Sequence, residues 1–210
     1  ALSPAYSHLY LCIAGELAAV ICIHDPLRRE ARDAVAALHA CGIGKVVMMT
    51  GDNRQTAQAV AREVGVDAVY AEVLPEDKAA FIRSEKAAGR TVIMVGDGVN
   101  DSPALSEADA GVAISTGAAI AREIADITIA SEDLFELVTL RRLSQALMAR
   151  IHRNYRFIVG FNLSLILLGV AGLLPPTTSA LLHNMSTLGI SLKSMTDLGP
   201  ELPSPTPAER

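Results

Sequence analysis

The chain has 210 residues, half of them hydrophobic, a formal net charge of −5 at pH 7, and a length that allows one or two domains. This acidic balance, without a basic stripe interleaved with aromatic residues, argues against a nucleic-acid-binding protein. The three cysteines are an odd number without CxxC spacing, which predicts reduced, buried thiols rather than disulfides or a soft-metal cluster.

Two apolar stretches near the start, Leu9–Ala14 and Leu17–Ile23, predict two strands joined by a tight turn. Apolar residues then recur at helical spacing from Leu27 to Leu38, which predicts an amphipathic helix. Asp25 lies between the second strand and this helix. This aspartate fits either a ligand-binding position at a strand end or a plain helix N-terminus.

The apolar stretch Lys45–Met49 predicts the next strand, and it ends at Thr50, Gly51 and Asp52. A hydroxyl, a glycine amide and an N-capping acid at the start of a helix form a suitable site for an anion. Ordinary helix caps use the same residue types, so this tripeptide alone leaves a structural role open.

After a short strand at Ala68–Ala71, a helix is predicted to begin at Pro75, with acidic residues in its first turn. Lys78 is unusual there, because a cation near a helix N-terminus opposes the helix dipole. This position indicates that Lys78 serves an anion outside the helix. A solvated lysine paired with Glu76 or Asp77 is the plainer alternative.

The stretch Val95–Leu105 follows an apolar run that predicts a buried parallel strand. Its glycines allow a sharp turn and a close backbone approach to a ligand. Asp97 and Asp101, four residues apart at a strand's carboxyl end, provide hard oxygen ligands suited to Mg²⁺. Phosphate chemistry is therefore indicated, although a capped strand-to-helix turn would use some of the same residues.

Short strands are also predicted at Ala110–Ile114 and Asp126–Ala130, around a helix at residues 117–124. The alternation of strands and helices from Leu17 onward predicts an α/β fold with a doubly wound parallel sheet. Ligands bind such sheets at the carboxyl ends of the strands. The aspartates and the threonine singled out above all fall at or just beyond predicted strand ends.

A long helix is predicted from Asp133 to Arg150, and the uncharged run Phe157–Leu174 then approaches the length that spans a bilayer. A weaker segment follows at residues 178–195, so we expect a transmembrane helical hairpin. The arginines that precede the run place the preceding domain on the cytoplasmic side. A core hairpin of a soluble protein is the alternative. The tail from Leu198 is Pro-rich and is expected to be disordered.

The sequence GDGVNDSPAL, Gly96–Leu105, resembles the GDGxNDxPAL motif of P-type ATPases, whose phosphorylation domain has a haloacid-dehalogenase-like fold. Thr50-Gly51-Asp52 resembles the TGD motif of the same family, and Lys78 matches its phosphate-neutralising lysine. The resemblance covers the chain from Leu9 to Met195. It is closest to the heavy-metal-transporting subclass, which ends in two helices directly after this domain.

The resemblance implies Mg²⁺ and ATP as cofactors and an aspartyl-phosphate intermediate. By motif, Asp97 and Asp101 would bind Mg²⁺, and Asn100 would help orient the phosphoryl group. The Thr50–Asp52 loop would hold that group and Lys78 would neutralise it. These roles agree with phosphoryl transfer by positioning and electrostatic stabilisation.

The expected membrane helices contain polar and soft side chains, which are costly in a span and usually face the helix bundle. His183-Asn184-Met185-Ser186-Thr187 resembles a variant of an eighth-helix motif of divalent-metal pumps. An Asn stands where a Glu is common, and Lys193 stands where an Asn is usual. The candidates for contact with the transported metal are Asn162, His183, Asn184 and Met185, and helix packing is an equal alternative for them.

The DKTGT motif that carries the family's nucleophilic aspartate does not occur in the chain. The sequence therefore predicts the C-terminal part of a multi-pass membrane pump, which is expected to be inactive alone. Its partners would be lipid, a heavy-metal cation and the rest of the pump. The expected division is a partial phosphorylation domain (1–132), a stalk helix (133–156), two transmembrane helices (157–196) and a tail (197–210). The plasma membrane is the expected location.

Two other functions remain open at this point. A membrane-anchored phosphatase of the same superfamily would need two aspartates at the end of the first strand, where His24-Asp25-Pro26 supplies one. A partner subunit that binds Mg²⁺ or phosphate without a nucleophile is the second.

Overall fold

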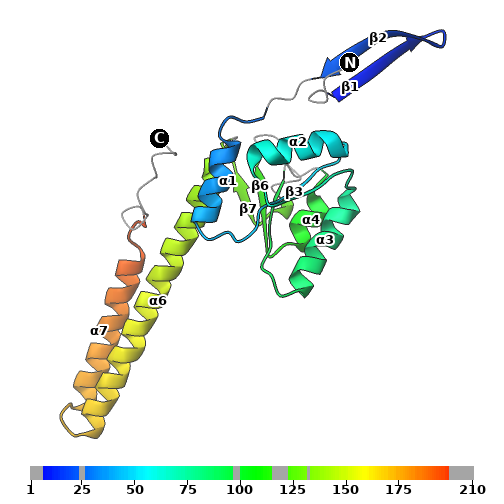
Figure 1. The fold of residues 1–210 in the computed structure, drawn as a ribbon. Helices are drawn as coiled ribbons and strands as arrows, with labels where there is room; N and C mark the ends of the chain where they lie inside the picture. Colours follow the sequence, from blue (N-terminus) through cyan, green and yellow to red (C-terminus); the bar gives the residue numbers. More distant parts are fainter. Residues whose placement is uncertain (1–6, 24–26, 97–99, 115–122, 132, 199–210) are drawn as a thin grey trace. The chain divides into compact units, whose positions relative to one another are not determined.

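The fold is taken from a computed structural model that describes residues 7–23, 27–96, 100–114, 123–131 and 133–198. The chain divides into two compact units, one running to Val138 and the other beginning at Thr139. The first unit contains every strand and the helices α1 to α4, and the second contains most of α6 and all of α7 (Figure 1).

The first two strands, β1 (Ser7–Ile13) and β2 (Glu16–Ile23), form an antiparallel hairpin. Ala14 and Gly15 at its turn both have positive φ, 54° and 87°, which suits a two-residue hairpin turn. The prediction that β2 belongs to the parallel sheet is therefore wrong. A two-residue turn returns the chain antiparallel, whereas parallel pairing needs a longer crossover.

The hairpin also corrects the expectation that all cysteines are buried. All three are free thiols, but Cys12 and Cys22 are exposed and only Cys41 is buried. Large apolar side chains such as Leu9 and Tyr10 are more than half exposed on the same hairpin. Both faces of the hairpin are thus open to solvent, which explains why its cysteines are accessible.

The other described strands of the first unit form two parallel ladders. One joins β3 (Val47–Met49) to β4 (Ala68–Tyr70), and the other has the order β5-β6-β7. In the second ladder, β5 is Ile93–Gly96, β6 is Ala110–Ile114 and β7 is Ile127–Ile129. The parallel α/β architecture predicted from the alternating pattern is confirmed for these strands.

Helices connect these strands in the order the sequence predicts. They are α1 (Ala31–Ala40), α2 (Arg54–Val64), α3 (Pro75–Ala87) and α4 (Ser102–Glu107). A buried cluster of Ile82, Met94, Ala104 and Leu105 joins α3, β5 and α4, and Met49 of β3 packs against it. Residues 117–122 of the helix expected at 117–124 lie outside the described residues.

Three aspartates that directly precede strands bind a backbone N–H within one residue of the start of the neighbouring strand. In each case the carboxylate Oδ2 accepts a hydrogen bond from a backbone N–H, over 2.6–2.8 Å. The pairs are Asp67 with Val46, Asp109 with Val92, and Asp126 with Gly111. These contacts fix the register of parallel strands where the strands begin.

Asp109 makes a testable contribution to stability at acid pH. The Val92 N–H, and to a lesser degree Lys86, lower the pKa of the Asp109 carboxyl, against an opposing effect of desolvation. Because the folded pKa lies below the ordinary value of about 3.9, the contact stabilises the fold fully above that value and is lost as the pH falls further. We expect Asp109→Asn to be less stable than the unchanged chain at pH 7, and this difference should shrink below about pH 4.

Urea-unfolding midpoints measured across this pH range check the prediction for Asp109. Asparagine keeps the shape and an acceptor oxygen, so the comparison isolates the charge. A stability difference that stays constant from pH 7 down to acid would contradict it.

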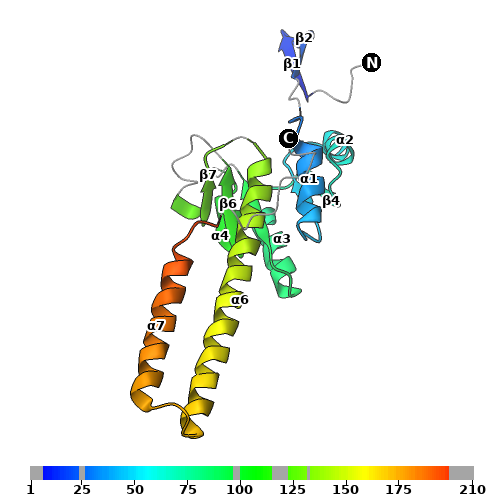
Figure 2. The ribbon, with the colours of Figure 1, turned by 90° about the vertical axis from the view of Figure 1, so that its left-hand side faces the viewer.

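In the second unit, α6 (Phe135–Val170) and α7 (Pro176–Ser194) lie side by side as an antiparallel pair (Figure 2). The stretch expected as a stalk and the start of the uncharged run lie in one continuous helix. This helix ends at Val170, four residues before the end of the run. None of the helices in the described residues combines the length and the apolar character that a membrane crossing requires. The expected transmembrane nature of the hairpin is thus not confirmed.

Arg150 closes the hairpin at the end opposite the turn. Its side chain is buried, with 4% of the residue exposed, and its two terminal nitrogens donate to Thr196 O (2.6 Å) and Asp197 O (2.8 Å). These carbonyls lie just past the C-terminus of α7, where a positive charge is favoured. Farther along, Asn154 donates to Ser194 Oγ at 3.0 Å.

Removing this clamp should loosen the last turn of α7. Arg150→Gln is expected to cost about 2 kcal/mol, the range for hydrogen bonds to a charged group. Hydrogen exchange at the amides of residues 192–196 should therefore speed up in Arg150→Gln. The exposed Arg156, replaced by Gln, is the control and should leave this exchange unchanged. Equal exchange rates in Arg150→Gln and the unchanged chain would contradict the assignment.

Candidate functional site

The loop after β3 is held by backbone hydrogen bonds to the segment after β4. Thr50 N donates to Tyr70 O (3.0 Å), Val73 N donates to Thr50 O (3.1 Å), and Glu72 N donates to Asp52 O (2.9 Å). The loop therefore lies beside the start of α3, which begins two residues after Val73.

Within this loop, Thr50 and Asp52 bind each other. Thr50 Oγ1 donates to Asp52 Oδ2 at 2.8 Å, and Asp52 N donates back to Thr50 Oγ1 at 3.1 Å. The expectation that Asp52 caps the next helix is wrong, because Asn53 Oδ1 accepts from Thr56 N and caps α2. The Asp52 carboxylate is thus not used by α2 and stays beside the exposed Gly51.

Lys78 of α3 pairs with Asp101, the residue that directly precedes α4. Lys78 Nζ lies 2.6 Å from Asp101 Oδ1, with 15% and 12% of the two side chains exposed. The alternative that Lys78 pairs with Glu76 or Asp77 of its own helix is not what the structure shows. Its cation reaches an anion outside α3, which offsets the unfavourable position near the helix N-terminus.

Gly96 is required for this placement of Asp101. A Cβ at Gly96 would lie 2.5 Å from Asp101 Oδ2, closer than real Cβ contacts. The sequence predicted that a glycine here allows a close approach to a ligand, and the group that approaches Gly96 is the carboxylate of Asp101. The end of β5 therefore packs tightly against the start of α4.

Three segments thus meet at the carboxyl ends of β3 and β5. The Thr50–Asp52 loop is bonded to the entry of α3, and α3 carries Lys78 to Asp101. Asn100 is exposed next to Asp101. Asp97 and Asp25, also expected at this edge, lie outside the described residues.

The donor chemistry at this edge fits Mg²⁺. Among the described residues, no three His, Cys, Asp or Glu side chains gather in a way that could enclose a metal ion. Mg²⁺ does not require three such side chains, because it is commonly bound by one or two carboxylates together with waters and phosphate oxygens. Asp101 presents such a carboxylate, fixed by Lys78 and Gly96.

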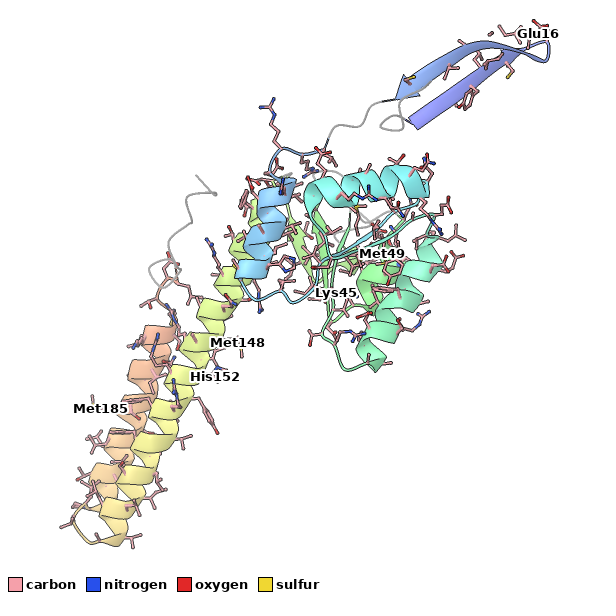
Figure 3. The ribbon with its side chains drawn as sticks, in the orientation of Figure 1. Glu16, Lys45, Met49, Met148, His152 and Met185 are labelled. Atoms are coloured by element: carbon pink, nitrogen blue, oxygen red, sulfur yellow. The ribbon has the colours of Figure 1, made fainter. Side chains whose placement is uncertain are left out.

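In the second unit, two of the four candidate metal contacts meet. His183 Nδ1 lies 2.8 Å from Asn162 Oδ1, so the two helices are joined by this hydrogen bond. With the amide oxygen as acceptor, Nδ1 carries the proton and Nε2 keeps its lone pair. Asn184 and Met185 are exposed, and Figure 3 labels Met185 on α7 (Figure 3).

Sequence reasoning missed Glu72, whose φ is 58°. This left-handed conformation is uncommon for a residue with a side chain and marks local strain. Through its N–H, Glu72 fixes the carbonyl of Asp52. No glycine or asparagine at that position signalled the turn.

With this geometry, the class of protein can be stated. Residues 3–109 match the haloacid dehalogenase-like hydrolases, and the chain belongs to this family.

Within that family, the chain is similar to heavy-metal P-type ATPases, which confirms the resemblance inferred from Gly96–Leu105. It is 46% identical over 176 residues to copper-transporting ATPase 2 of Rhizobium meliloti (strain 1021), covering 84% of this chain and 21% of that protein. It is 40% identical over 191 residues to the manganese-exporting P-type ATPase of Mycobacterium tuberculosis (strain ATCC 25618 / H37Rv), covering 90% of this chain and 27% of that protein.

A solved structure gives the same result. The crystal structure of a zinc-transporting PIB-type ATPase in its E2.Pi state matches with a TM-score of 0.80 and 29% identity, over 92% of this chain and 32% of that one. The chain therefore spans between a fifth and a third of the length of these relatives.

Proposed function

We propose that the chain is the C-terminal part of an ATP-driven heavy-metal cation pump that works through an aspartyl-phosphate. The observation that carries this proposal is the part-buried Lys78–Asp101 pair, linked through α3 to the Thr50–Asp52 loop at the carboxyl ends of parallel strands. Phosphoryl transfer needs such a combination of cation, carboxylate and hydrogen-bonding loop, because its catalysis is mainly positioning and charge stabilisation.

Each group of the site has a role in this proposal. Thr50, Gly51 and Asp52 hold the phosphoryl group, Lys78 neutralises its charge, and Asn100 helps to orient it. Asp101 and Asp97 would hold Mg²⁺, which offsets the charge of phosphate oxygens when bound. The bond between Asp101 and Lys78 keeps the ammonium at the end of β5 before the phosphoryl group arrives.

The nucleophile would come from a strand outside this chain. Among the described residues, β3 pairs with β4 alone and β5 with β6 alone, so each has one unpaired edge. Ile93 and Val95, on one face of β5, are 46% and 36% exposed, although parallel strands are normally covered on both faces. A strand carrying the DKTGT aspartate would pair with these edges and end beside the Thr50–Asp52 loop.

The hairpin of α6 and α7 would lie in the membrane part of the complete pump, with the α/β unit on the cytoplasmic side. Its support is the uncharged run 157–174, the arginines before it and the exposed apolar side chains along both helices. Asn162, His183, Asn184 and Met185 are the proposed contacts for the transported cation. The similar proteins are named for copper, manganese and zinc, so these metals belong in the test below.

One observation favours a second candidate function. The chain contains no DKTGT motif, so a partner subunit that binds Mg²⁺ or phosphate without catalysis would also use this site.

The test joins the chain to an upstream segment that carries DKTGT and expresses the product in membrane vesicles. Radiolabelled ATP and a panel of Cu⁺, Zn²⁺, Cd²⁺, Co²⁺ and Mn²⁺ are added, beside an Asp97→Ala version. The pump is supported by an acid-stable phosphoenzyme that one metal stimulates and Asp97→Ala abolishes. If no metal gives a phosphoenzyme while Mg²⁺ binding is intact, the binding-subunit function is favoured instead.

A further inference from the structure

A methionine and a histidine of α6 lie next to each other on a surface that the sites described above do not use. Met148 and His152 are separated by one helical turn, a spacing at which two side chains on a helix are neighbours, with Cβ atoms about 5–6 Å apart. Figure 3 shows both on the same side of α6 (Figure 3). Both are exposed, Met148 by 49%. They therefore present a thioether sulfur and imidazole nitrogens to the same patch of surface.

This patch lies opposite the side of α6 that faces α7. Ala146 and Arg150 are buried, and Arg150 donates to the carbonyls just past the end of α7. At about 100° per residue, Met148 lies roughly 200° around the helix from both of them, and His152 lies equally far from Arg150. In the part of the chain that the structure describes, neither Met148 nor His152 uses its side chain in a hydrogen bond or ion pair. Their donor atoms are therefore free for a ligand.

The chemistry of the two donors selects a soft cation. Thioether sulfur and imidazole are ligands of Cu⁺, whereas Mg²⁺, Ca²⁺ and Mn²⁺ prefer the oxygens of carboxylates, carbonyls and water. A structural zinc site is closed by about four donors from thiolates, imidazoles and carboxylates. Among the described residues, no three His, Cys, Asp or Glu side chains gather to supply them. Cu⁺ and its analogue Ag⁺, by contrast, are held by a single pair of soft donors.

The arginines that follow on α6 do not exclude such an ion. Arg153 and Arg156 are close in sequence to His152, and a cation held by charge alone would be sensitive to them. A thioether and a neutral imidazole bind a metal by donating an electron pair, which needs no opposite charge. This holds whatever partners the arginines have. Nearby arginine therefore weakens a hard-cation site far more than a soft one.

We propose that Met148 and His152 form a surface site for a soft monovalent cation, Cu⁺ or Ag⁺. The ion binds the sulfur of Met148 and one ring nitrogen of His152, and so links the two side chains across one turn of α6. This site goes beyond the pump proposed above and does not depend on it, because both ligands belong to one helix of this chain. It is also separate from the cargo candidates, none of which is one of these two residues.

Ag⁺ is the probe for the test, because it shares the soft chemistry of Cu⁺ without its redox reactions. Cys12 and Cys22 are exposed thiols that would capture Ag⁺ first, so both are replaced by serine in every sample. NMR then follows the methionine methyl and histidine ring signals of the otherwise complete 210-residue chain during titration with Ag⁺. We expect the signals of Met148 and His152 to shift together, with one midpoint.

A variant and a matched control isolate the part played by sulfur. Met148→Leu removes the sulfur but keeps the apolar volume and a high helix propensity. It should raise the Ag⁺ concentration at the His152 midpoint roughly a hundredfold, the advantage that a second linked donor gives. Met195→Leu is the control, because Met195 is 83% exposed and no histidine lies within four residues of it in the sequence. It should leave the His152 midpoint unchanged.

Three results would overturn the site. Separate midpoints for Met148 and His152 would show that each side chain binds Ag⁺ alone. An unchanged His152 midpoint in Met148→Leu would show that the sulfur takes no part. Zn²⁺ binding at the same or lower concentration, with the same dependence on Met148, would overturn the assignment to a soft monovalent cation. Failure of the phosphoenzyme test with a joint Ag⁺ shift retained would refute the pump and support this site.

Discussion

Replacing Gly111 by alanine is expected to destabilise the α/β unit by about 3 kcal/mol, as inserting a methyl group into a closely packed core does. A Cβ at Gly111 would lie 2.6 Å from the backbone oxygen of Leu105 and 3.2 Å from its carbonyl carbon. Backbone atoms cannot move away as a flexible side chain would, and Leu105 is 1% exposed. The strand β6 and the helix α4 would have to separate.

Urea unfolding followed by circular dichroism measures this loss of stability. Gly44→Ala is the matched control, because nothing lies within 4 Å of its added Cβ. That change should leave the free energy of unfolding the same or slightly higher. A Gly111→Ala chain as stable as the Gly44→Ala chain would contradict the packing of α4 on β6.

The second large effect is expected from Lys78→Met. It leaves the carboxylate of Asp101 buried without its cation, which typically costs 3–5 kcal/mol. Removing both charges, in Lys78→Met with Asp101→Asn, should restore most of that loss. Unfolding free energies of the two single variants and the double variant give the coupling between the side chains directly.

An exposed ion pair of the same unit provides the comparison for Lys78. Arg83 Nη1 lies 3.2 Å from Glu107 Oε2, and 56% of the arginine side chain is exposed. Arg83→Met should cost less than about 1 kcal/mol, as exposed pairs generally do. Similar costs for Lys78→Met and Arg83→Met would show that the Lys78–Asp101 pair is not energetically distinct.

Much of the fold followed from local sequence patterns. Pro75 marked the start of α3, and the apolar runs at residues 47–49, 93–96 and 110–114 became parallel strands. Periodicity identifies such elements because each one buries a defined face. The pairing of β2 was harder to predict, because the sequence of a strand does not identify its partner strand. The turn at Ala14 and Gly15 determines that partner.

The site was predicted less completely. Motifs identified Thr50, Asp52, Lys78 and Asp101, but the sequence did not indicate that Lys78 pairs with Asp101, 23 residues away. Contacts of this kind depend on how α3 and α4 pack, which no local pattern encodes. The same is true of Gly111, which must lack a side chain only because α4 crosses β6 at this point.

The three strand-entry aspartates show a related limit. Asp67, Asp109 and Asp126 each stand before a strand, where sequence analysis finds only an ordinary loop acid. Their backbone partners lie within one residue of the start of neighbouring strands, 15 to 21 residues away in sequence. Knowledge of the strand order was needed before these contacts could be recognised.

The central claim is that this chain supplies the phosphate-binding half of a catalytic site whose nucleophile arrives on another segment. The most direct test expresses the chain and a separate upstream segment carrying DKTGT, alone and together, and measures acid-stable label from radiolabelled ATP. We predict label on the DKTGT aspartate only when both pieces are present, and its loss with Lys78→Met. Label on the upstream segment without this chain, or undiminished label with Lys78→Met in a folded complex, would contradict the account.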